Sequence, residues 1–435
     1  MHTVAAIAAS CTEVDRPTSG SWQRRGGVGV TDGQLVQTDR SLRIGVVGFG
    51  NRGIIAHRAL DTDEARRHGD QVVAVSDPGP AAQQRGQELF GADLAVGDSV
   101  STVIDAGVDA AIVTSPDDAH CEQVVALLEA GIAVFCDKPM AITTAEADLI
   151  LTTAHRTGSK LYVGHNMRHM PVIRLMKEII DSGRIGEVKA VWVRHFIGEG
   201  GDRFFRDWHA DRRRVNSLLL QKGSHDLDII HWLAGGYTSR VSAMGGLTVY
   251  GDIEGRDDHA GQRVTDWISD QNWPPTELPD VNPVVDVEDL QQVNLALDNG
   301  VYATYAECHF TPDDWRNYTV IGTRGRLENV GMEGQVRVWD RRKAFNERGD
   351  EEIPVPAAQG GHHGADPTML AEFLAFVRTG VPTLTNPVAA RYAVAAGDFA
   401  TQSLRTGGST LPIPTLDPNL RAYFEAGQDR HGRIQ

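Results

Sequence analysis

The pattern of apolar and polar positions divides the chain into two parts with different predicted elements. Over residues 41–163, apolar runs at 42–47, 71–76, 108–113 and 132–136 alternate with segments of helical periodicity. Near-continuous apolar runs are typical of parallel strands buried on both faces, and the helices between them supply the crossovers. The pattern therefore predicts an α/β domain with a doubly wound parallel sheet over residues 41–163.

Residues 164–435 have the pattern of an α+β domain. A helix with an apolar face is predicted from near Pro171 to Ser182-Gly183. Turn sequences such as Asp298-Asn299-Gly300 predict hairpins, so we expect a largely antiparallel sheet. The predicted strands of this sheet cover residues 188–197, 240–250, 289–297, 301–309 and 318–322.

Two features of this second part lie outside the predicted sheet. Closing helices are predicted within residues 366–405, because Asp366-Pro367 and Asn386-Pro387 each set an N-cap acceptor before a proline at the first helical position. Residues 251–283 are polar, acidic and proline-bearing, and this segment is long for a plain connection. We expect it to be a functional flap, an interface arm or a mobile loop.

The first apolar run leads into a glycine-rich turn of the form Gly-x-Gly-x-x-Gly. Gly48, Gly50 and Gly53 form this motif, and a helix-like segment follows it. Such a turn lets the backbone and the helix N-terminus approach the pyrophosphate of a dinucleotide. The second apolar run ends at Asp77, where a dinucleotide fold places the acid that binds the adenosine ribose. A carboxylate there favours NAD over NADP, because it repels a 2′-phosphate.

Composition and charge narrow the function classes. With 435 residues, 41% hydrophobic and 23% charged, the chain is typical of a globular protein with two domains. The formal net charge of −16 argues against nucleic acid or an anionic membrane as a partner. The four cysteines form no Cys-x-x-Cys pair, which argues against a disulfide framework or a metal site and favours a reducing cytoplasm. No apolar run reaches the length of a membrane span, and we expect residues 1–40 to be a disordered tail without a secretory signal.

Three polar clusters follow predicted elements in places where ligands bind. Asp137-Lys138-Pro139 follows a strand whose carboxyl end should face the ligand crevice, so Lys138 is expected to point at the reactive end of the cofactor. A second cluster, residues 163–169, lies at the junction of the two parts. In the third, His225 and Asp228 are one helical turn apart, so the carboxylate could hold the imidazole as a proton shuttle.

In this order, the motifs resemble those of the glucose–fructose oxidoreductase, inositol dehydrogenase and rhizopine dehydrogenase (Gfo/Idh/MocA) family. The resemblance covers residues 42 to about 405. The family has Glu-Lys-Pro where this chain has Asp137-Lys138-Pro139. The other matching pieces are Gly48 to Gly53, Asp77, Thr114-Ser115-Pro116 with His120, Asn166 and Arg168 before Pro171, residues 183–187, and Gly223-x-His225-x-x-Asp228.

The resemblance implies an N-terminal Rossmann domain that binds NAD, a C-terminal domain with an open-faced sheet, and a homo-oligomer, either a dimer or a tetramer. It also implies sugars or cyclitols as substrates, with Lys138 and His225 as the catalytic residues, and no metal. The cofactor-binding residues that the motifs and the resemblance predict are Gly48, Phe49, Gly50, Asn51, Arg52, Gly53, Asp77, Thr114, Ser115, Pro116, His120, Asp137, Lys138 and Asn166.

One departure from the family pattern changes the expected chemistry. The family has Asp-x-Gly-x-His, and its aspartate commonly helps to move the substrate hydroxyl proton, whereas this chain has Gln221 at that position. An amide cannot accept a proton there, so proton removal is expected to fall to His225 or Lys138, with Gln221 orienting the substrate. A lysine can act as a base only if burial or nearby positive charge lowers its pKa. The adjacent Lys222 adds such a charge.

The segment from Gly198 to Asn216 is the expected substrate selector, because it combines aromatic residues with arginines. Aromatic faces suit the apolar side of a sugar ring, and guanidinium groups suit anionic substituents, so an anionic sugar is predicted. The alternative is that these arginines pair with acidic surface in an oligomer. The expected substrate residues are Arg168, Trp208, Arg212, Arg213, Gln221, Lys222 and Asp228.

Three functions compete at this stage. The first is an NAD-dependent oxidoreductase that moves a hydride between a sugar or cyclitol carbon and the nicotinamide. The second is a redox-neutral, NAD-dependent glycosidase that oxidises the sugar transiently, eliminates the leaving group and returns the hydride. The third is a non-catalytic NAD sensor, which the presence of both Lys138 and His225 disfavours.

Overall fold

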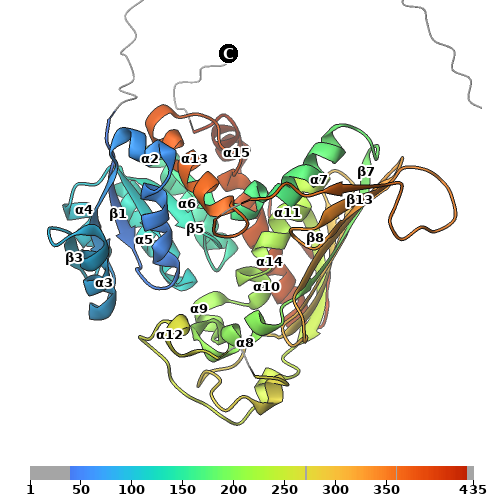
Figure 1. Cartoon of the computed structure of the whole chain (residues 1–435), viewed down its shortest axis with the longest axis horizontal. Coiled ribbons are helices and arrows are strands. Elements are labelled where there is room, and N and C mark those ends of the chain that lie inside the picture. Colours follow the sequence, from blue (N-terminus) through green and yellow to red (C-terminus); the bar gives the residue numbers. More distant parts are fainter. Residues whose placement is uncertain (1–39, 270–271, 359, 429–435) are drawn as a thin grey trace, which may run out of the picture. The chain divides into compact units, whose positions relative to one another are not determined.

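The computed structural model describes residues 40–269, 272–358 and 360–428 (Figure 1). The predicted tail, residues 1–40, lies outside this part of the chain except for Arg40. The first sheet is parallel and has the order β3-β2-β1-β4-β5-β6, which confirms the Rossmann prediction. Its strands are β1 (Arg43–Val47), β2 (Gln71–Ser76), β3 (Ala95–Gly97), β4 (Ala110–Val113), β5 (Ala133–Asp137) and β6 (Leu161–Gly164).

Helices cover both faces of this sheet, and one of them comes from far along the chain. Phe373 and Phe376 of α13 (Ala365–Thr379) pack in one cluster with Phe135 of β5 and Tyr162 of β6. The sheet's own helices are α1 (Ile55–Leu60), α2 (Asp63–His68), α3 (Pro80–Phe90), α4 (Val100–Asp105), α5 (His120–Glu129) and α6 (Thr144–Thr157). The core of the N-terminal domain is therefore completed by residues near the C-terminus.

The second sheet has the order β14-β13-β12-β11-β7-β10-β9-β8-β15. All its pairings are antiparallel except that between β7 and β10, so the prediction of a largely antiparallel sheet is confirmed. Its strands are β7 (Val188–Phe196), β8 (Thr238–Gly246), β9 (Leu290–Leu297), β10 (Tyr302–Cys308), β11 (Trp315–Gly322), β12 (Arg326–Val330), β13 (Gln335–Trp339), β14 (Glu351–Pro354) and β15 (Leu411–Pro412). Sequence analysis missed β12 to β15.

Helices cover one face of this sheet. They are α7 (Pro171–Asp181), α11 (Ser224–Ala234) and α14 (Pro387–Arg405) (Figure 1). Strand residues alternate accordingly: Tyr305 of β10 is buried under α11, whereas Tyr302 on the opposite face is 64% exposed. Trp192 and Met244 are also exposed large apolar side chains of this sheet.

The expected caps of the two closing helices differ in outcome. The Asn386 side chain accepts a hydrogen bond from the Val388 N–H and caps α14 as predicted. The prediction that Asp366 caps α13 is wrong, because the helix begins at Ala365, two residues before Pro367, and Gly364 occupies the cap position. The Asp366 carboxylate instead accepts hydrogen bonds from Arg52 of the N-terminal domain and from Asn166.

The described residues of the segment 251–283 include the short α-helix α12 (Val264–Trp267), and the segment reaches the glycine-rich turn. The Thr265 hydroxyl donates to Oδ1 of Asn51 at 3.1 Å. Leu278 and Val281 of the same segment pack with Phe205 in a small apolar cluster. Among the described helices, none is long and apolar enough to cross a membrane.

Candidate active site

The glycine-rich turn has the geometry that a dinucleotide requires. Gly48 has φ +82°, and a Cβ on it would lie 2.5 Å from the backbone of Ser115. A Cβ on Gly53 would lie 2.8 Å from the ring of Phe49, so this glycine allows the helix to pack closely on the turn. Gly50 faces open space, because a Cβ on it would meet no other part of the protein within 4 Å. The turn therefore leaves room for a pyrophosphate to approach the backbone.

Asp77 lies where the ribose acid was expected, directly after β2. Its carboxylate accepts hydrogen bonds from the N–H groups of Phe49 at 2.7 Å and Gly79 at 2.8 Å. These bonds fix the carboxylate beside the glycine-rich turn. The position of the acid and the shape of the turn fit an NAD molecule.

A cavity of about 710 Å³ joins this turn to the second domain. Its volume is in the range of small-molecule and cofactor sites. Of the predicted cofactor residues, the cavity is lined by Gly48, Gly50, Asn51, Arg52, Asp77, Thr114, Ser115 and Pro116. From the other side come Arg203, Phe204, Asp207, Trp208, His209, Arg214, Gln221 and Lys222. The cofactor turn thus shares one cavity with three of the expected substrate residues, Trp208, Gln221 and Lys222.

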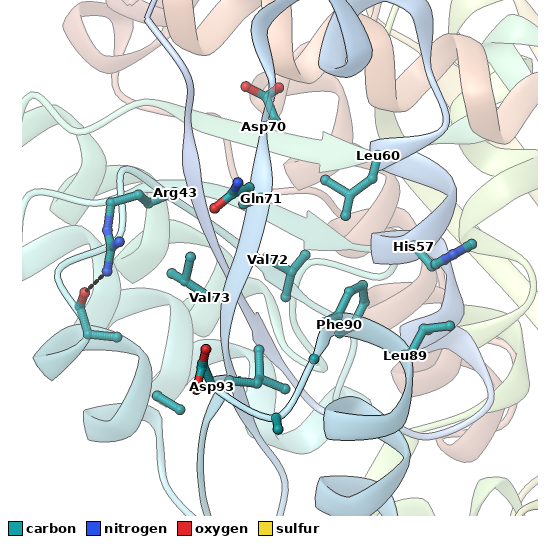
Figure 2. Close-up of a pocket in the computed structure, with 15 residues that line it drawn as sticks. Arg43, His57, Leu60, Asp70, Gln71, Val72, Val73, Leu89, Phe90 and Asp93 are labelled. Carbon is teal, nitrogen blue, oxygen red and sulfur yellow. Dashed lines mark hydrogen bonds between the residues drawn. The ribbon is translucent and has the colours of Figure 1, made fainter.

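A second cavity of similar size, about 730 Å³, lies beside β2 and the end of α3 (Figure 2). His57, Val72, Phe90 and Asp93 are among the residues that line it. Its lining includes no residue of the glycine-rich turn and none of the expected substrate residues. We therefore assign the candidate active site to the first cavity.

Lys138 spans the boundary between the domains. It follows β5, and its Nζ donates a hydrogen bond to the main-chain oxygen of Gln221 at 2.9 Å. Burial lowers the pKa of Lys138, although Asp117 and Asp137 act in the opposite direction. Burial also raises the pKa of Asp117. Sequence analysis missed Asp117, although its place directly after Thr114-Ser115-Pro116 is a usable signal.

Arg52 fixes the residue that precedes Lys138. Its Nε donates to Asp137 at 2.8 Å, and its Nη1 donates to Asp366 at 3.0 Å. Asn166 donates to the same Asp366 carboxylate at 3.1 Å. Burial opposes the charge on Arg52, but Asp137 and Asp366 outweigh it and raise its pKa. This network ties the glycine-rich turn, the end of β5 and α13 together.

His120 is buried behind the cavity. Its two ring nitrogens lie 2.8 Å from the oxygen of Pro139 and 2.9 Å from the oxygen of Ser115. The ring therefore connects the Thr114-Ser115-Pro116 loop to the segment that carries Lys138. Like Phe49, Gly53, Asp137, Lys138 and Asn166, it stands next to the residues that line the cavity rather than among them.

His225 does not have the partner that its sequence spacing suggested. Asp228 instead accepts two hydrogen bonds from Arg168, from Nε at 2.8 Å and Nη2 at 2.7 Å, and this pair is buried. His225 Nδ1 has no hydrogen-bond partner among the described residues. Burial and the charges of Lys138 and Arg316 hold the pKa of His225 well below its usual range, so the imidazole is neutral at pH 7.

The three consecutive arginines, Arg212 to Arg214, have different partners. Arg212 pairs with Asp286, and Arg213 pairs with Asp211 and is 75% exposed. Neither lines the cavity, and neither Arg168 nor Asp228 does so. Arg214 lines it and lies over the ring of Trp208, which stacks on His209 at 3.8 Å between centroids.

A buried polar cluster behind the cavity was not predicted. Its centre is Asp226, which accepts hydrogen bonds from Arg316 Nη2 at 2.8 Å and from the hydroxyl of Tyr305 at 3.0 Å. His195 Nδ1 lies 3.1 Å from the same carboxylate. These residues come from α11, β7, β10 and β11, so no local pattern in the sequence could bring them together.

The fold and this cavity define a two-domain, NAD-binding oxidoreductase. The profile "Oxidoreductase family, NAD-binding Rossmann fold" matches residues 42–165, and "Oxidoreductase family, C-terminal alpha/beta domain" matches residues 177–413. The chain belongs to the Gfo/Idh/MocA family of oxidoreductases, and its cofactor is NAD.

Several named proteins are similar to this chain. The putative oxidoreductase YteT of Bacillus subtilis is 26% identical over 61% of this chain and 71% of its own length. Inositol 2-dehydrogenase 2 of Saccharopolyspora erythraea is 33% identical over 45% of this chain, and the match spans 54% of that enzyme. Levoglucosan dehydrogenase, solved with NADH and levoglucosan, superposes with a TM-score of 0.70 at 17% identity, covering 86% of this chain and 100% of that one. This last likeness concerns the fold alone.

Proposed function

We propose that the protein is an NAD-dependent dehydrogenase that oxidises a hydroxyl group of a sugar or cyclitol. The observation that carries this proposal is the shared cavity, which is lined by the glycine-rich turn on one side and by Trp208, Gln221 and Lys222 on the other. The names of the similar inositol dehydrogenases support a polyhydroxylated ring as substrate.

The bound nicotinamide supplies a hydride acceptor, and the residues of this chain position the alcohol. Lys138 and His225 are the catalytic residues of the proposal. The Lys138 ammonium group, held at the domain boundary by the Gln221 carbonyl, polarises the reacting hydroxyl group. The neutral imidazole of His225 forms a hydrogen bond with the same hydroxyl group. The Trp208 ring offers an apolar face to the sugar.

Arg203 and Arg214 make the cavity suitable for an anionic sugar, because both guanidinium groups belong to residues that line it. The exposed Arg213 contributes nothing to this selection. We therefore expect uronates to be oxidised with a lower KM than neutral sugars of the same ring configuration, and Arg214→Met to remove that difference.

The test is an assay of the purified protein with NAD⁺ and a panel of substrates. The panel contains myo-inositol, levoglucosan, neutral aldoses, uronates and aryl glycosides. Accumulation of NADH with a free sugar or cyclitol supports the proposal. Release of the aglycone from an aryl glycoside without net NADH identifies the redox-neutral glycosidase instead. The dehydrogenase assignment is wrong if no substrate yields NADH.

The outer face of the second sheet is the proposed contact in a homo-oligomer. Trp192 and Met244 are 53% and 72% exposed there, and large exposed apolar side chains on one face are typical of contact surfaces. Sedimentation of the wild-type protein and of a Trp192→Lys, Met244→Lys variant tests this assignment. We expect the variant to be a monomer with unchanged NAD binding, and an unchanged oligomer in the variant contradicts it.

A further inference from the structure

The side chain of Lys222 belongs to the wall of the active-site cavity. It follows the short helix α10 (Leu218–Gln221), and its N–H donates to the oxygen of Leu218 at 2.7 Å. The next residue, Gly223, makes the turn into α11 possible, because a Cβ there would lie 2.3 Å from the oxygen of Leu219. This turn directs Lys222 toward Phe204, whose ring centroid is 5.5 Å from Nζ.

Lys222 is not paired with an acidic side chain among the described residues. Among the described residues, its Nζ makes no hydrogen bond and no ion pair. The two acids that favour its charge, Asp226 and Glu307, are already bonded to other residues. Asp226 accepts from Arg316 and Tyr305, and Glu307 lies 2.6 Å from Nε2 of His309 and accepts from Tyr305 at 2.7 Å.

The surroundings of Lys222 therefore favour the neutral amine. Burial, together with the positive charges of Arg316 and Lys138, lowers its pKa to about 7. The titratable and charged groups that act on it, or on which it acts, are Arg316 on β11, Lys138 after β5, Asp226 and His225 on α11, Glu307 on β10, His195 on β7, and His209 after α8 (Glu199–Arg206).

Lys138 is in a different position. Its Nζ donates to the Gln221 carbonyl, and both Asp117 and Asp137 favour its charged form. Burial lowers the pKa of Lys138 as well, but the Gln221 carbonyl and the two acids favour its ammonium form, whereas the Nζ of Lys222 has no hydrogen-bond partner among the described residues. Gln221, which precedes Lys222, has an amide that cannot take a proton.

We propose that the Lys222 amine is the catalytic base that takes the proton of the substrate hydroxyl group, a role that rests on the proposed dehydrogenase function. During oxidation the O–H bond breaks and its proton goes to the lone pair of Nζ, which becomes an ammonium group. The C–H bond breaks at the same carbon, its two electrons leave with the hydride to NAD⁺, and the carbon becomes a carbonyl carbon. Reduction returns the proton from Nζ to the carbonyl oxygen.

Competitive labelling with acetic anhydride tests the protonation of Lys222 without any substrate. The reagent is small and acylates only neutral amines, so the labelling rate of each lysine peptide, followed by mass spectrometry against pH, gives its midpoint. In the NAD-bound protein we expect a midpoint near pH 7 for Lys222. The exposed Lys189 is the internal control. A Lys222 midpoint above about 9.5, close to that of an ordinary lysine, overturns the proposal.

Two substitutions shift this midpoint in opposite directions. Lys138→Met removes a nearby positive charge, so the midpoint should rise. Glu307→Gln removes a negative charge that favours the ammonium group, so the midpoint should fall. Absence of both shifts overturns the electrostatic argument.

Kinetics then test the role in catalysis. Lys222→Met should lower kcat by about 100-fold or more, and Lys222→Arg, which is always charged, should not restore it. The rise of kcat through pH 7 should disappear in both variants. Their affinity for NADH should stay within about twofold of the wild-type value. Lys189→Met is the matched control. Retention of the pH 7 limb in Lys222→Met overturns the proposal. If the wild-type enzyme oxidises no substrate, the dehydrogenase function fails, and the labelling midpoint still decides whether Lys222 is a neutral amine.

Discussion

Lys138 and Gln221 form a direct hydrogen bond between the two domains, with the Lys138 Nζ 2.9 Å from the Gln221 main-chain oxygen. The bond connects the end of β5, in the cofactor-binding sheet, to the residue that replaces the family aspartate. Arg52 holds Asp137 on one side of this lysine, and His120 holds Pro139 on the other. The lysine is therefore positioned by both domains.

We expect Lys138→Met to lower kcat by about 100-fold or more, because the variant loses the ammonium group that we propose polarises the reacting hydroxyl group. Binding of ADP-ribose should be unchanged, since the glycine-rich turn and Asp77 are intact. Steady-state kinetics and calorimetry measure the two quantities. The matched control is Lys160→Met, which removes another lysine that donates to main-chain carbonyls, those of Phe376 and Val377, far from the cavity lining. Lys160→Met should lower stability and leave kcat unchanged. Equal losses of kcat in Lys138→Met and Lys160→Met contradict the catalytic role of Lys138.

The parts of this arrangement that follow local patterns were predictable from the sequence. The glycine-rich turn, Asp77 and Lys138 each stand at the end of a strand whose apolar run is visible, and the parallel fold brings these ends together. The buried cluster of Asp226, Arg316 and Tyr305 was not predictable, because Tyr305 and Arg316 lie 79 and 90 positions after Asp226 in the sequence and only the folded chain brings them into contact. The later strands β12 to β14 have only four or five residues each, so each of them offers few alternating positions.

Contacts between residues that are far apart in the sequence also explain two wrong interpretations. The Asp366-Pro367 pair has the form of a helix cap, but the carboxylate is used by Arg52, 314 positions away. The spacing of His225 and Asp228 suggests a pair, but Arg168 offers a bidentate contact that an imidazole cannot match. Local spacing predicts which residues can meet, and longer-range partners decide which of them do.

The Arg168–Asp228 pair should contribute strongly to stability. Asp228→Asn leaves the buried guanidinium group without a counter-charge, and we expect it to lower the free energy of unfolding by about 3 kcal/mol. A double variant, Arg168→Met with Asp228→Leu, should lose less than the single variant, because no charge stays buried and unpaired. Denaturant unfolding measures both. The control is Asp63→Asn at an exposed ion pair with Arg66, and a loss no larger than in this control contradicts the prediction.

The same pair predicts a pH dependence of stability. Burial acts against the charged form of Asp228, but Arg168 outweighs it, so the pKa of this carboxyl is lowered in the folded state. A group with a lowered folded-state pKa contributes stability above its unfolded pKa, which is about 3.9, and loses that contribution as pH falls toward the folded pKa. Between pH 7 and pH 3, the melting temperature of the wild-type protein should therefore fall more steeply than that of Asp228→Asn. Parallel curves contradict this account.

Asp77 should determine the choice between NAD and NADP. Asp77→Ala removes the carboxylate that would face a 2′-phosphate, so the ratio of kcat/KM for NADP⁺ to that for NAD⁺ should rise by about tenfold or more. The loss of hydrogen bonds to Phe49 and Gly79 should also weaken NAD binding. Asp77→Asn removes the charge but keeps one side-chain oxygen as a hydrogen-bond acceptor. It should therefore raise the NADP⁺ to NAD⁺ ratio of kcat/KM with a smaller loss of NAD affinity. An unchanged ratio in both variants shows that Asp77 does not select the cofactor.

The contact between Thr265 and Asn51 predicts that the segment 251–283 slows release of the cofactor. Thr265 of α12 contacts Asn51 of the glycine-rich turn, and its neighbour Val264 lines the active-site cavity. Thr265→Val preserves the shape of the side chain and removes the hydrogen bond, which is worth about 0.5–1.5 kcal/mol. We therefore expect NADH to dissociate about two- to tenfold faster, as followed by its fluorescence in a stopped-flow experiment. Thr248→Val, in a threonine bonded to Asp289 instead of the turn, is the control and should leave this rate unchanged. Equal dissociation rates in Thr265→Val and the wild-type protein would show that the segment touches the turn without holding the cofactor.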